Sequence, residues 1–163
     1  MPSDEPATPE PTAYEVRPVA TVHCGRARAV DDDWGAVTAT IELLAPFDGQ
    51  ALVGLEEFSH IEVLFVFHGV DPAAATTGAR HPRGNRAWPE VGIFAQRAKD
   101  RPNRLGLSTC EVVAVEGSTV VVRGLDAIDG TPVLDIKPVM AGFAPRGVVR
   151  QPPWSHELMA GYW

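Results

Sequence analysis

Two loops in the second half of the chain hold residues whose types and spacing suit the binding of a charged ligand. The first, RAKDRPNRLG (residues 97–106), places four basic side chains around a proline and an asparagine. The second, LDAIDGTPVLDIKP (residues 125–138), places three aspartates and one lysine around a tight Asp129–Gly130 turn. Because loops carried by rigid strands are common places for function, we predict that these two loops hold a ligand.

The basic residues of the chain gather in one stretch. Residues 80–104 contain seven arginines and lysines against only Glu90 and Asp100, although the net charge of the chain is −7. Lys and Arg supply most of a protein's affinity for phosphate groups, so a basic stripe on an acidic body is one interpretation. Ordinary solvated arginines on an exposed loop are the other. The candidate substrate contacts in this stretch are Arg83, Arg86, Arg101, Asn103 and Arg104.

The acidic residues of the second loop also have two interpretations. Asp126 and Asp129 could contact hydroxyl or amino groups of a ligand, or they could be turn residues, since Asp before Gly is a common turn signal. Asp135 and Lys137 fall on the same face of an expected strand. They could form a structural ion pair or line a substrate pocket.

We expect no metal site. Cys24 and Cys110 lie far apart and outside any CxxC or Cys/His cluster, and the histidines lack the spacing of metal ligands. Two reduced, structural thiols are the preferred interpretation. The aromatic residues near the end of the sequence could stack on a base, but such residues more often close the edge of a core or a subunit seam; they are Trp154, Tyr162 and Trp163.

Strand-like patterns surround both loops. Residues 36–47 alternate apolar and polar, which predicts a half-buried strand with Val37, Ala39, Ile41 and Leu43 on one face. Residues 61–69 form a run of mainly apolar, β-branched and aromatic residues, which favours a strand covered on both faces. Residues 112–124 predict a hairpin that turns at Gly117–Ser118, and residues 132–139 predict a further strand.

The expected fold class is therefore mainly β with antiparallel connections. Residues 51–60 predict a short helical turn, and residues 70–89 predict a long surface loop of the kind that is often functional. Periodicity alone equally supports a five-stranded oligonucleotide-binding barrel.

The length of 163 residues fits one domain. Residues 1–14 are rich in proline and acidic residues and are predicted to be a disordered tail, which leaves residues 15–163 as a single β domain. No run of eighteen apolar residues occurs, and no basic region followed by an apolar core begins the sequence. We therefore expect a cytoplasmic protein without a membrane span.

Three segments together resemble one known family. FSHIEVLFVFH, GIFAQRAKDRPNRLG and LDAIDGTPVLDIKP occur in an order and spacing similar to those of the TsaA-like (YaeB/TrmO) family of S-adenosylmethionine-dependent tRNA adenosine N6-methyltransferases. The resemblance covers roughly Pro18 to Met140. It implies a single antiparallel sheet curled into a barrel-like TsaA-like domain with short helical insertions, and an active site shared between the two subunits of a homodimer.

The resemblance also implies which residues hold S-adenosyl-L-methionine. Acidic oxygens, an arginine and apolar walls suit a ligand that carries an amine, a carboxylate, ribose hydroxyls and an adenine. The implied positions are Trp34, Gly35, His68, Gly69, Arg97, Leu107, Asp126, Ala127, Ile128 and Asp129. No GxGxxG motif follows a strand, which disfavours a Rossmann-type methyltransferase.

The implied reaction transfers a methyl group to the exocyclic N6 of an adenosine beside the anticodon of tRNA. Two alternatives stay open. One is a methyltransferase that uses the same fold on a nucleoside or another small molecule. The other is a non-catalytic module that binds the cofactor or RNA. No proton acceptor is assigned.

Overall fold

The computed structural model describes residues 12–163 of the chain. The expected disordered tail, residues 1–14, lies outside the described residues except for its last three positions. Nine helices and strands follow in the described part, together with several short 3-10 turns.

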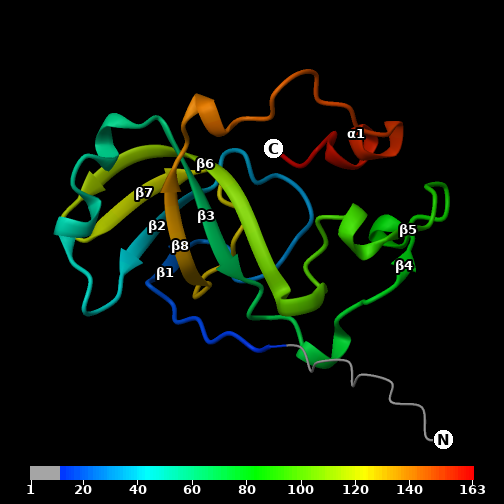
Figure 1. The fold of residues 1–163 in the computed structure, drawn as a ribbon, viewed down its shortest axis with the longest axis horizontal. Coiled ribbons are helices and arrows are strands. Elements are labelled where there is room, and N and C mark those ends of the chain that lie inside the picture. The colour runs from blue at the N-terminus through cyan, green and yellow to red at the C-terminus, as the bar shows by residue number, and fades with distance from the viewer. Residues whose placement is uncertain (1–11) are drawn as a thin grey trace, which may run out of the picture.

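Six strands close into an antiparallel barrel in the order β1-β2-β7-β6-β3-β8 (Figure 1). Closure comes from β1 and β8, which pair Ala20 with Val133 and Thr21 with Pro132. This confirms the mainly β, barrel-like fold class, with six strands instead of the five of an oligonucleotide-binding barrel. The barrel strands are β1 (Ala20–Cys24), β2 (Thr38–Leu43), β3 (His60–Val66), β6 (Leu105–Glu116), β7 (Thr119–Arg123) and β8 (Pro132–Pro138).

Alternating side chains explain why these segments form barrel strands. In β2, Ala39 and Ile41 are buried while Thr38 and Glu42 are exposed, as the sequence predicts. The predicted hairpin joins β6 to β7, and its turn residue Gly117 adopts a φ of 58°, which is accessible to glycine without steric cost. The expected helical turn is present as two 3-10 segments, Gly49–Leu52 and Leu55–Glu57.

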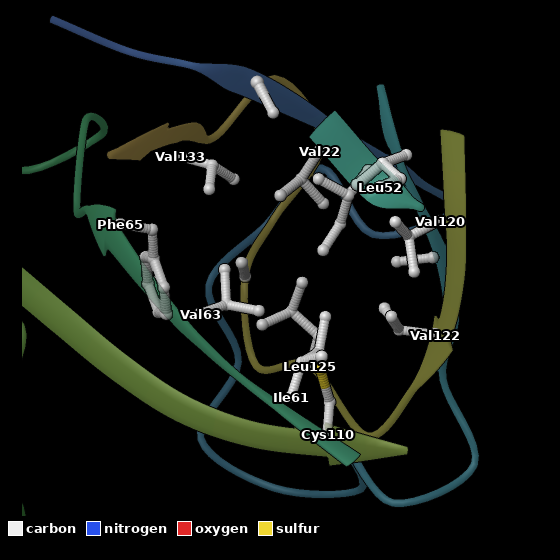
Figure 2. Close-up of a cluster of buried hydrophobic side chains, with 14 residues drawn as sticks. Val22, Leu52, Ile61, Val63, Phe65, Cys110, Val120, Val122, Leu125 and Val133 are labelled. Carbon is white, nitrogen blue, oxygen red and sulfur yellow. The ribbon is translucent and has the colours of Figure 1, made fainter. Parts of the chain in front are cut away.

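The inward side chains of all six strands fill the barrel with apolar groups (Figure 2). Ile61, Val63 and Phe65 of β3 are essentially inaccessible to solvent and meet Val120 and Val122 of β7 across the interior. Burying side chains of this size stabilises the fold by roughly 1.5–3 kcal/mol each. The barrel is therefore a packed core and leaves the chemistry to its ends and its outer surface.

The expectation that β3 is covered on both faces is wrong. Its burial alternates, and the outward residues Glu62, Leu64 and Val66 are only half-buried. The sequence suggested cover on both faces because a strand with apolar side chains on both of its faces shows little alternation between apolar and polar residues. In a barrel, one of those faces is the outer wall.

Residues 70–104 leave the barrel between β3 and β6 and are called the arm here. The arm contains the two-residue strands β4 (Ala79–Arg80) and β5 (Val91–Gly92), which pair with each other, so the expected long loop has its own structure. Short 3-10 turns complete it, at Pro72–Ala74, Pro82–Gly84, Ile93–Ala95 and Pro102–Arg104.

A bidentate ion pair joins Arg80 of β4 to Asp100 near the end of the arm. The amide of Gln96, a buried side chain, donates to the backbone oxygens of Arg80 and Val91 at 3.1 and 2.8 Å. These polar bonds brace the arm, none of whose residues 70–104 belongs to the apolar core cluster of the barrel.

After β8 the chain passes a 3-10 turn at Ala141–Phe143 and reaches the helix α1 (Pro153–Met159). Figure 1 shows α1 beside the arm, away from most of the barrel. Residues 153–163 are called the return segment here. They comprise α1 and residues 160–163, which run from α1 back toward the barrel end. Within residues 12–163, no helix has the length and apolar character needed to cross a membrane.

Candidate functional site

Asp126 is the centre of the polar cluster at one end of the barrel. It lies in the loop between β7 and β8, directly after the buried Leu125. Its Oδ1 accepts a hydrogen bond from the Ser108 hydroxyl of β6, and its Oδ2 accepts one from the Tyr162 hydroxyl of the return segment. Both donors are neutral hydroxyl groups. The orientation of the carboxylate is therefore fixed from two sides without a cationic partner in either bond.

The hydroxyl of Tyr162 remains a donor over the whole biological pH range. Burial of the ring raises the pKa of Tyr162 well above its usual range, and the neighbouring charge of Asp126 raises that pKa further. The cations of Arg97 and Arg83 act on the same pKa in the opposite direction, so both guanidinium groups are electrostatic neighbours of this hydroxyl. Asp126 therefore faces a mixed field of neutral donors and nearby cations.

Arg97 and Leu107 come together beside this cluster. Arg97 is exposed in the first ligand loop, and its guanidinium donates to the backbone oxygen of Leu107 in β6. Ser108 is the next residue of the same strand and reaches Asp126. The basic loop and the acidic loop therefore meet at the start of β6, the convergence that a shared ligand site requires.

A second group of expected cofactor residues lies at the other end of the same loop. Gly69 faces Ile128, because a Cβ atom at Gly69 would lie 3.7 Å from the Ile128 Cδ1. His68 faces Gly130 in the same way, with its Nε2 at 3.8 Å. His68 and Gly69 are both exposed. The loop of residues 126–129 therefore connects the Asp126 cluster to the exposed end of β3.

Asp129 and Ala127 turn partly toward β1. The Oδ1 atom of Asp129 accepts a hydrogen bond from the backbone N–H of Cys24 at 3.1 Å, while the Cys24 thiol donates to the Ala127 oxygen at 3.4 Å. Asp129 is thus a loop-bracing residue that is also exposed. The turn interpretation and the ligand interpretation of this aspartate are compatible.

Trp34 and Gly35 are held by the return segment. The backbone N–H of Trp34 donates to the Tyr162 oxygen at 2.8 Å, and that of Asp33 donates to the Gly161 oxygen at 3.0 Å. The guanidinium of Arg26 lies 4.5 Å from the centroid of the Trp34 ring, a cation–π contact. These residues join the Asp126 cluster through Tyr162.

The candidate substrate residues of the arm differ in how freely they present their charge. Arg83 forms an ion pair with Asp32 at 2.8 Å, so part of its charge is already matched. Arg101 and Arg104 donate to backbone oxygens, those of Gln96 at 2.8 Å and Val70 at 2.9 Å, and keep their charge. Arg86 and Asn103 are exposed to solvent.

Three of these positions carry backbone strain. Arg83, Asn103 and Arg104 have φ values of 51°, 61° and 52°, in the left-handed region that non-glycine residues rarely occupy. Such conformations persist when surrounding contacts hold them, and they concentrate at ligand-binding loops. The strain falls on the two arm turns that also carry the candidate phosphate contacts.

Asp135 and Lys137 form an ion pair on the outer face of β8, which is one of the two interpretations of their spacing. The Lys137 Nζ lies 2.6 Å from the Asp135 Oδ2, and the neighbouring carboxylate raises the pKa of Lys137. Neither residue contacts the Asp126 cluster through a hydrogen bond. Asp135 also lines a surface hollow together with Leu43 and Phe47, so the ion pair and the pocket interpretation are compatible.

Sequence reasoning missed Ser108 and Tyr162. Ser108 is buried at an inward position of β6, where a lone serine is most often a tolerated core residue. Tyr162 is 36 residues from Asp126 along the chain, and the signal available for it was its place among the terminal aromatic residues. Only the barrel closure and the return of the chain bring the three side chains together.

No group of three or more metal-ligating side chains occurs within residues 12–163. The cluster instead offers a carboxylate, two hydroxyl groups and an exposed guanidinium, and the same loop carries the apolar side chain of Ile128. Such a set can bind a ligand that carries both an amine or hydroxyl groups and a carboxylate.

The fold and the cluster together define a closed antiparallel barrel whose polar end carries the ligand loops. The sequence profile of the tRNA-methyltransferase O N-terminal domain matches residues 32–144. The chain therefore belongs to the tRNA-methyltransferase O family, and the resemblance stated from the three segments is confirmed.

Individual relatives agree with this assignment. The chain is 46% identical over 93 residues to the mouse tRNA (adenine(37)-N6)-methyltransferase, an alignment that covers 57% of this chain and 21% of the relative. It is 41% identical over 126 residues to a putative S-adenosylmethionine-dependent methyltransferase, RcsF, from Pseudomonas aeruginosa, covering 72% of this chain and 53% of the relative. The chain thus spans about half of the bacterial relative and a fifth of the mouse one.

A solved structure has the same architecture. The crystal structure of TrmO from Pseudomonas aeruginosa superposes with a TM-score of 0.72 at 30% identity. The match covers 89% of this chain and 63% of that chain. The barrel and most of its added segments are therefore shared with that protein.

Proposed function

We propose that this protein is an S-adenosyl-L-methionine-dependent methyltransferase that methylates the exocyclic N6 of an adenosine beside the tRNA anticodon. One observation carries the proposal. Within the segment that matches the family, the basic loop and the acidic loop meet, so that Arg97, Leu107 and Asp126 lie around one cluster. The relatives named as tRNA (adenine(37)-N6)-methyltransferases supply the substrate class.

The side chains present fit the proposed cofactor. Asp126 and Asp129 offer carboxylate oxygens for an amine or for ribose hydroxyl groups. The exposed guanidinium of Arg97 can bind a carboxylate. Ile128 is a partly exposed apolar side chain that can cover an adenine ring, while Leu107 contributes its backbone oxygen, which holds the Arg97 guanidinium.

When bound, S-adenosyl-L-methionine would supply a methyl group whose transfer to the amine breaks a carbon–sulfur bond and leaves a neutral thioether. In-line transfer depends above all on alignment, and positioning by rigid groups can supply much of the barrier reduction. Asp126 meets that requirement, because two hydrogen bonds from separate elements fix its carboxylate. Its negative charge also favours a positively charged ligand at this end of the barrel.

The arm supplies the proposed contacts to tRNA. Arg86, Arg101 and Arg104 keep their charge, and Asn103 sits in a strained turn between the last two. Phosphate contacts of this kind make affinity fall steeply with salt. Arg83 contributes less to this surface because Asp32 already pairs with it.

We also propose that the protein is a homodimer in the cytoplasm. Several large apolar side chains of β6 and the arm are exposed, which suits burial against a second subunit: Phe94, Leu105, Leu107 and Val113. The two free cysteines suit a reducing compartment. Light scattering coupled to size-exclusion chromatography would test the dimer, with a monomeric mass as the contradicting result.

The function is tested with tRNA from a strain that lacks its own enzyme of this class. We expect the purified protein, given S-adenosylmethionine carrying a labelled methyl group, to produce N6-methylated adenosine nucleosides detectable by mass spectrometry. The Asp126→Asn variant is the matched control and should lose most of the activity. Tight cofactor binding without product from tRNA would instead favour the binding module or a small-molecule substrate, which free nucleosides would then test.

The salt dependence of tRNA binding tests the arm separately. We expect the logarithm of the affinity to fall linearly with the logarithm of the salt concentration. Replacing Arg86 with Ala should reduce the slope by roughly one unit. A flat salt response would remove the arm from the proposed tRNA surface.

A further inference from the structure

The return segment is built into the candidate site. Besides the Tyr162 hydroxyl on Asp126, its backbone oxygens at Gly161 and Tyr162 accept hydrogen bonds from Asp33 and Trp34. These contacts join three regions that are distant in sequence: the loop before β2, the loop after β7 and the residues after α1.

The same segment is anchored to the arm at its other end. The indole N–H of Trp88 donates to the Glu157 carboxylate at 2.7 Å, and the Trp88 and Trp154 rings lie 6.5 Å apart. Residues 153–163 therefore bridge the arm and the barrel end. A segment held at both ends places the Tyr162 hydroxyl with little freedom to move.

Gly35 shows that the contact is close. A Cβ atom at this position would lie 2.6 Å from the backbone carbon of Trp163 and 3.2 Å from its Cα. The atoms in the way belong to the backbone, so they cannot move aside as the end of a flexible side chain could. The absence of a side chain at Gly35 is what lets the return segment lie against the loop before β2.

The geometry of Asp126 gives this docking a chemical consequence. A carboxylate has about four lone-pair sites, and the hydroxyls of Ser108 and Tyr162 each use one. The remaining sites are free for a ligand, and neither donor cancels the charge. Burial and the adjacent carboxylate raise the pKa of Tyr162, so this donor stays protonated at neutral pH.

We propose that Tyr162 is a positioning residue that orients the Asp126 carboxylate toward the cofactor, and that Gly35 acts by admitting the return segment. This inference rests on the proposed function, because it deepens the description of the same cofactor site. It gives Gly35 a role through Tyr162 in place of direct contact with the cofactor.

The chain contains its own matched control. It has two tyrosines, and Tyr14 is 86% exposed. Tyr162→Phe and Tyr14→Phe each remove one hydroxyl group. We expect Tyr162→Phe to weaken S-adenosylmethionine binding by roughly three- to tenfold in calorimetry. The variant loses a hydrogen bond to the Asp126 carboxylate, and that carboxylate is the group proposed to contact the ligand. Tyr14→Phe should leave the affinity unchanged.

A double-mutant cycle separates positioning from general support of the fold. If Tyr162 acts through Asp126, then adding Tyr162→Phe to Asp126→Asn should cause no further loss of affinity. A merely structural tyrosine would weaken binding by the same factor in both backgrounds. Equal losses in the two backgrounds would therefore overturn the inference.

Gly35→Ala tests the docking by a second route. The added methyl group should displace the return segment, which would reduce the protection of the Trp34 amide against hydrogen exchange and weaken cofactor binding at least as much as Tyr162→Phe. Unchanged cofactor affinity in Gly35→Ala would overturn the role given to Gly35.

Hydrogen exchange also shows whether Tyr162→Phe displaces the whole return segment instead of removing the hydroxyl contact alone. The Trp34 amide should stay protected in that variant, because its partner is the backbone oxygen of Tyr162. Weaker binding together with lost protection would overturn the specific role of the hydroxyl. Wild-type protein that binds no S-adenosylmethionine would contradict the proposed function itself, whereas normal wild-type binding with an unaffected Tyr162→Phe variant would contradict this inference alone.

Discussion

The barrel interior and its polar end are built on the same strand but are held together by different physics. On β6, Cys110 and Ser108 are both buried and lie two residues apart, so they face the same way. Cys110 belongs to the apolar core, whereas Ser108 donates a hydrogen bond to Asp126. The core depends on non-directional burial, and the polar end depends on a few directional bonds.

The two regions also affect each other across this short distance. Burial raises the pKa of the Cys110 thiol to about 12, and the charge of Asp126 contributes to that rise. Cys110 therefore stays an unionised, structural thiol next to a charged cluster. The comparison teaches that stability should be lost mainly through the core, and ligand binding mainly through the cluster.

The largest expected effect is on stability, from the core. Phe65→Ala should lower the free energy of unfolding by about 3–5 kcal/mol, because Phe65 is 1% exposed and its removal leaves a cavity. Urea denaturation would measure it. Phe143→Ala is the matched control, since Phe143 is 88% exposed and its loss should cost little stability. Similar losses for both variants would break the distinction between core and surface.

The arm should show an intermediate effect that depends on pH. The guanidinium of Arg80 holds the pKa of Asp100 below its ordinary value of 3.8, so the ionised form is favoured in the folded state. This contribution is fully present above that ordinary value and is lost as the pH falls through the lowered native value. Asp100→Asn should therefore destabilise the protein by about 1–2 kcal/mol at neutral pH.

The pH dependence of that difference is the decisive measurement. The stability gap between the wild type and Asp100→Asn should be constant at neutral pH and should shrink below roughly pH 4. Glu90→Gln, an exposed acidic residue of the same arm, is the control and should show no gap. A gap that does not shrink in acid would mean that the ion pair is not its source.

Ser108→Ala should separate binding from stability. Removing one of the two donors to Asp126 should cost about 1 kcal/mol of stability. The loss of S-adenosylmethionine affinity should be comparable to that of Tyr162→Phe, because each hydroxyl holds one carboxylate oxygen. Calorimetry and thermal unfolding on the same sample would measure both quantities. A large stability loss with unchanged affinity would place Ser108 with the core instead of the site.

The smallest effect is expected on the outer wall. Lys137→Ala removes the ion pair with Asp135, in which the Lys137 side chain is 67% exposed and the Asp135 side chain 43% exposed. Such pairs contribute little, so the denaturation midpoint should not change. A clear fall in activity with an unchanged midpoint would favour the substrate-pocket interpretation of Asp135 and Lys137.

Most of the barrel could be predicted from the sequence, because a strand reports its buried face through alternation. The β2 pattern and the β6–β7 turn at Gly117 both followed from local residue types. The apolar run of β3 misled, since alternation disappears when the outer wall is also apolar. The short strands of the arm were missed because two-residue pairings leave no periodic signal.

The candidate site was predictable only in part, and for a different reason. Family resemblance pointed to Arg97, Leu107 and Asp126, which meet at the start of β6. Resemblance gave no indication of Ser108, and the aromatic residues near the end of the sequence suggested a core edge or a subunit seam. Tyr162 reaches Asp126 from a segment that is held on the arm through Trp88 and on the loop before β2 through Trp34.

The sequence by itself determined the type and order of the strands, the charged character of the two loops and membership of the family, because these depend on neighbouring residues and on motif spacing. The tertiary structure decided which side chains hold Asp126. Ser108 and Tyr162 lie 18 and 36 residues from it, and contacts at that separation depend on strand register, barrel closure and the path of the return segment. Local propensity carries no information about any of these three.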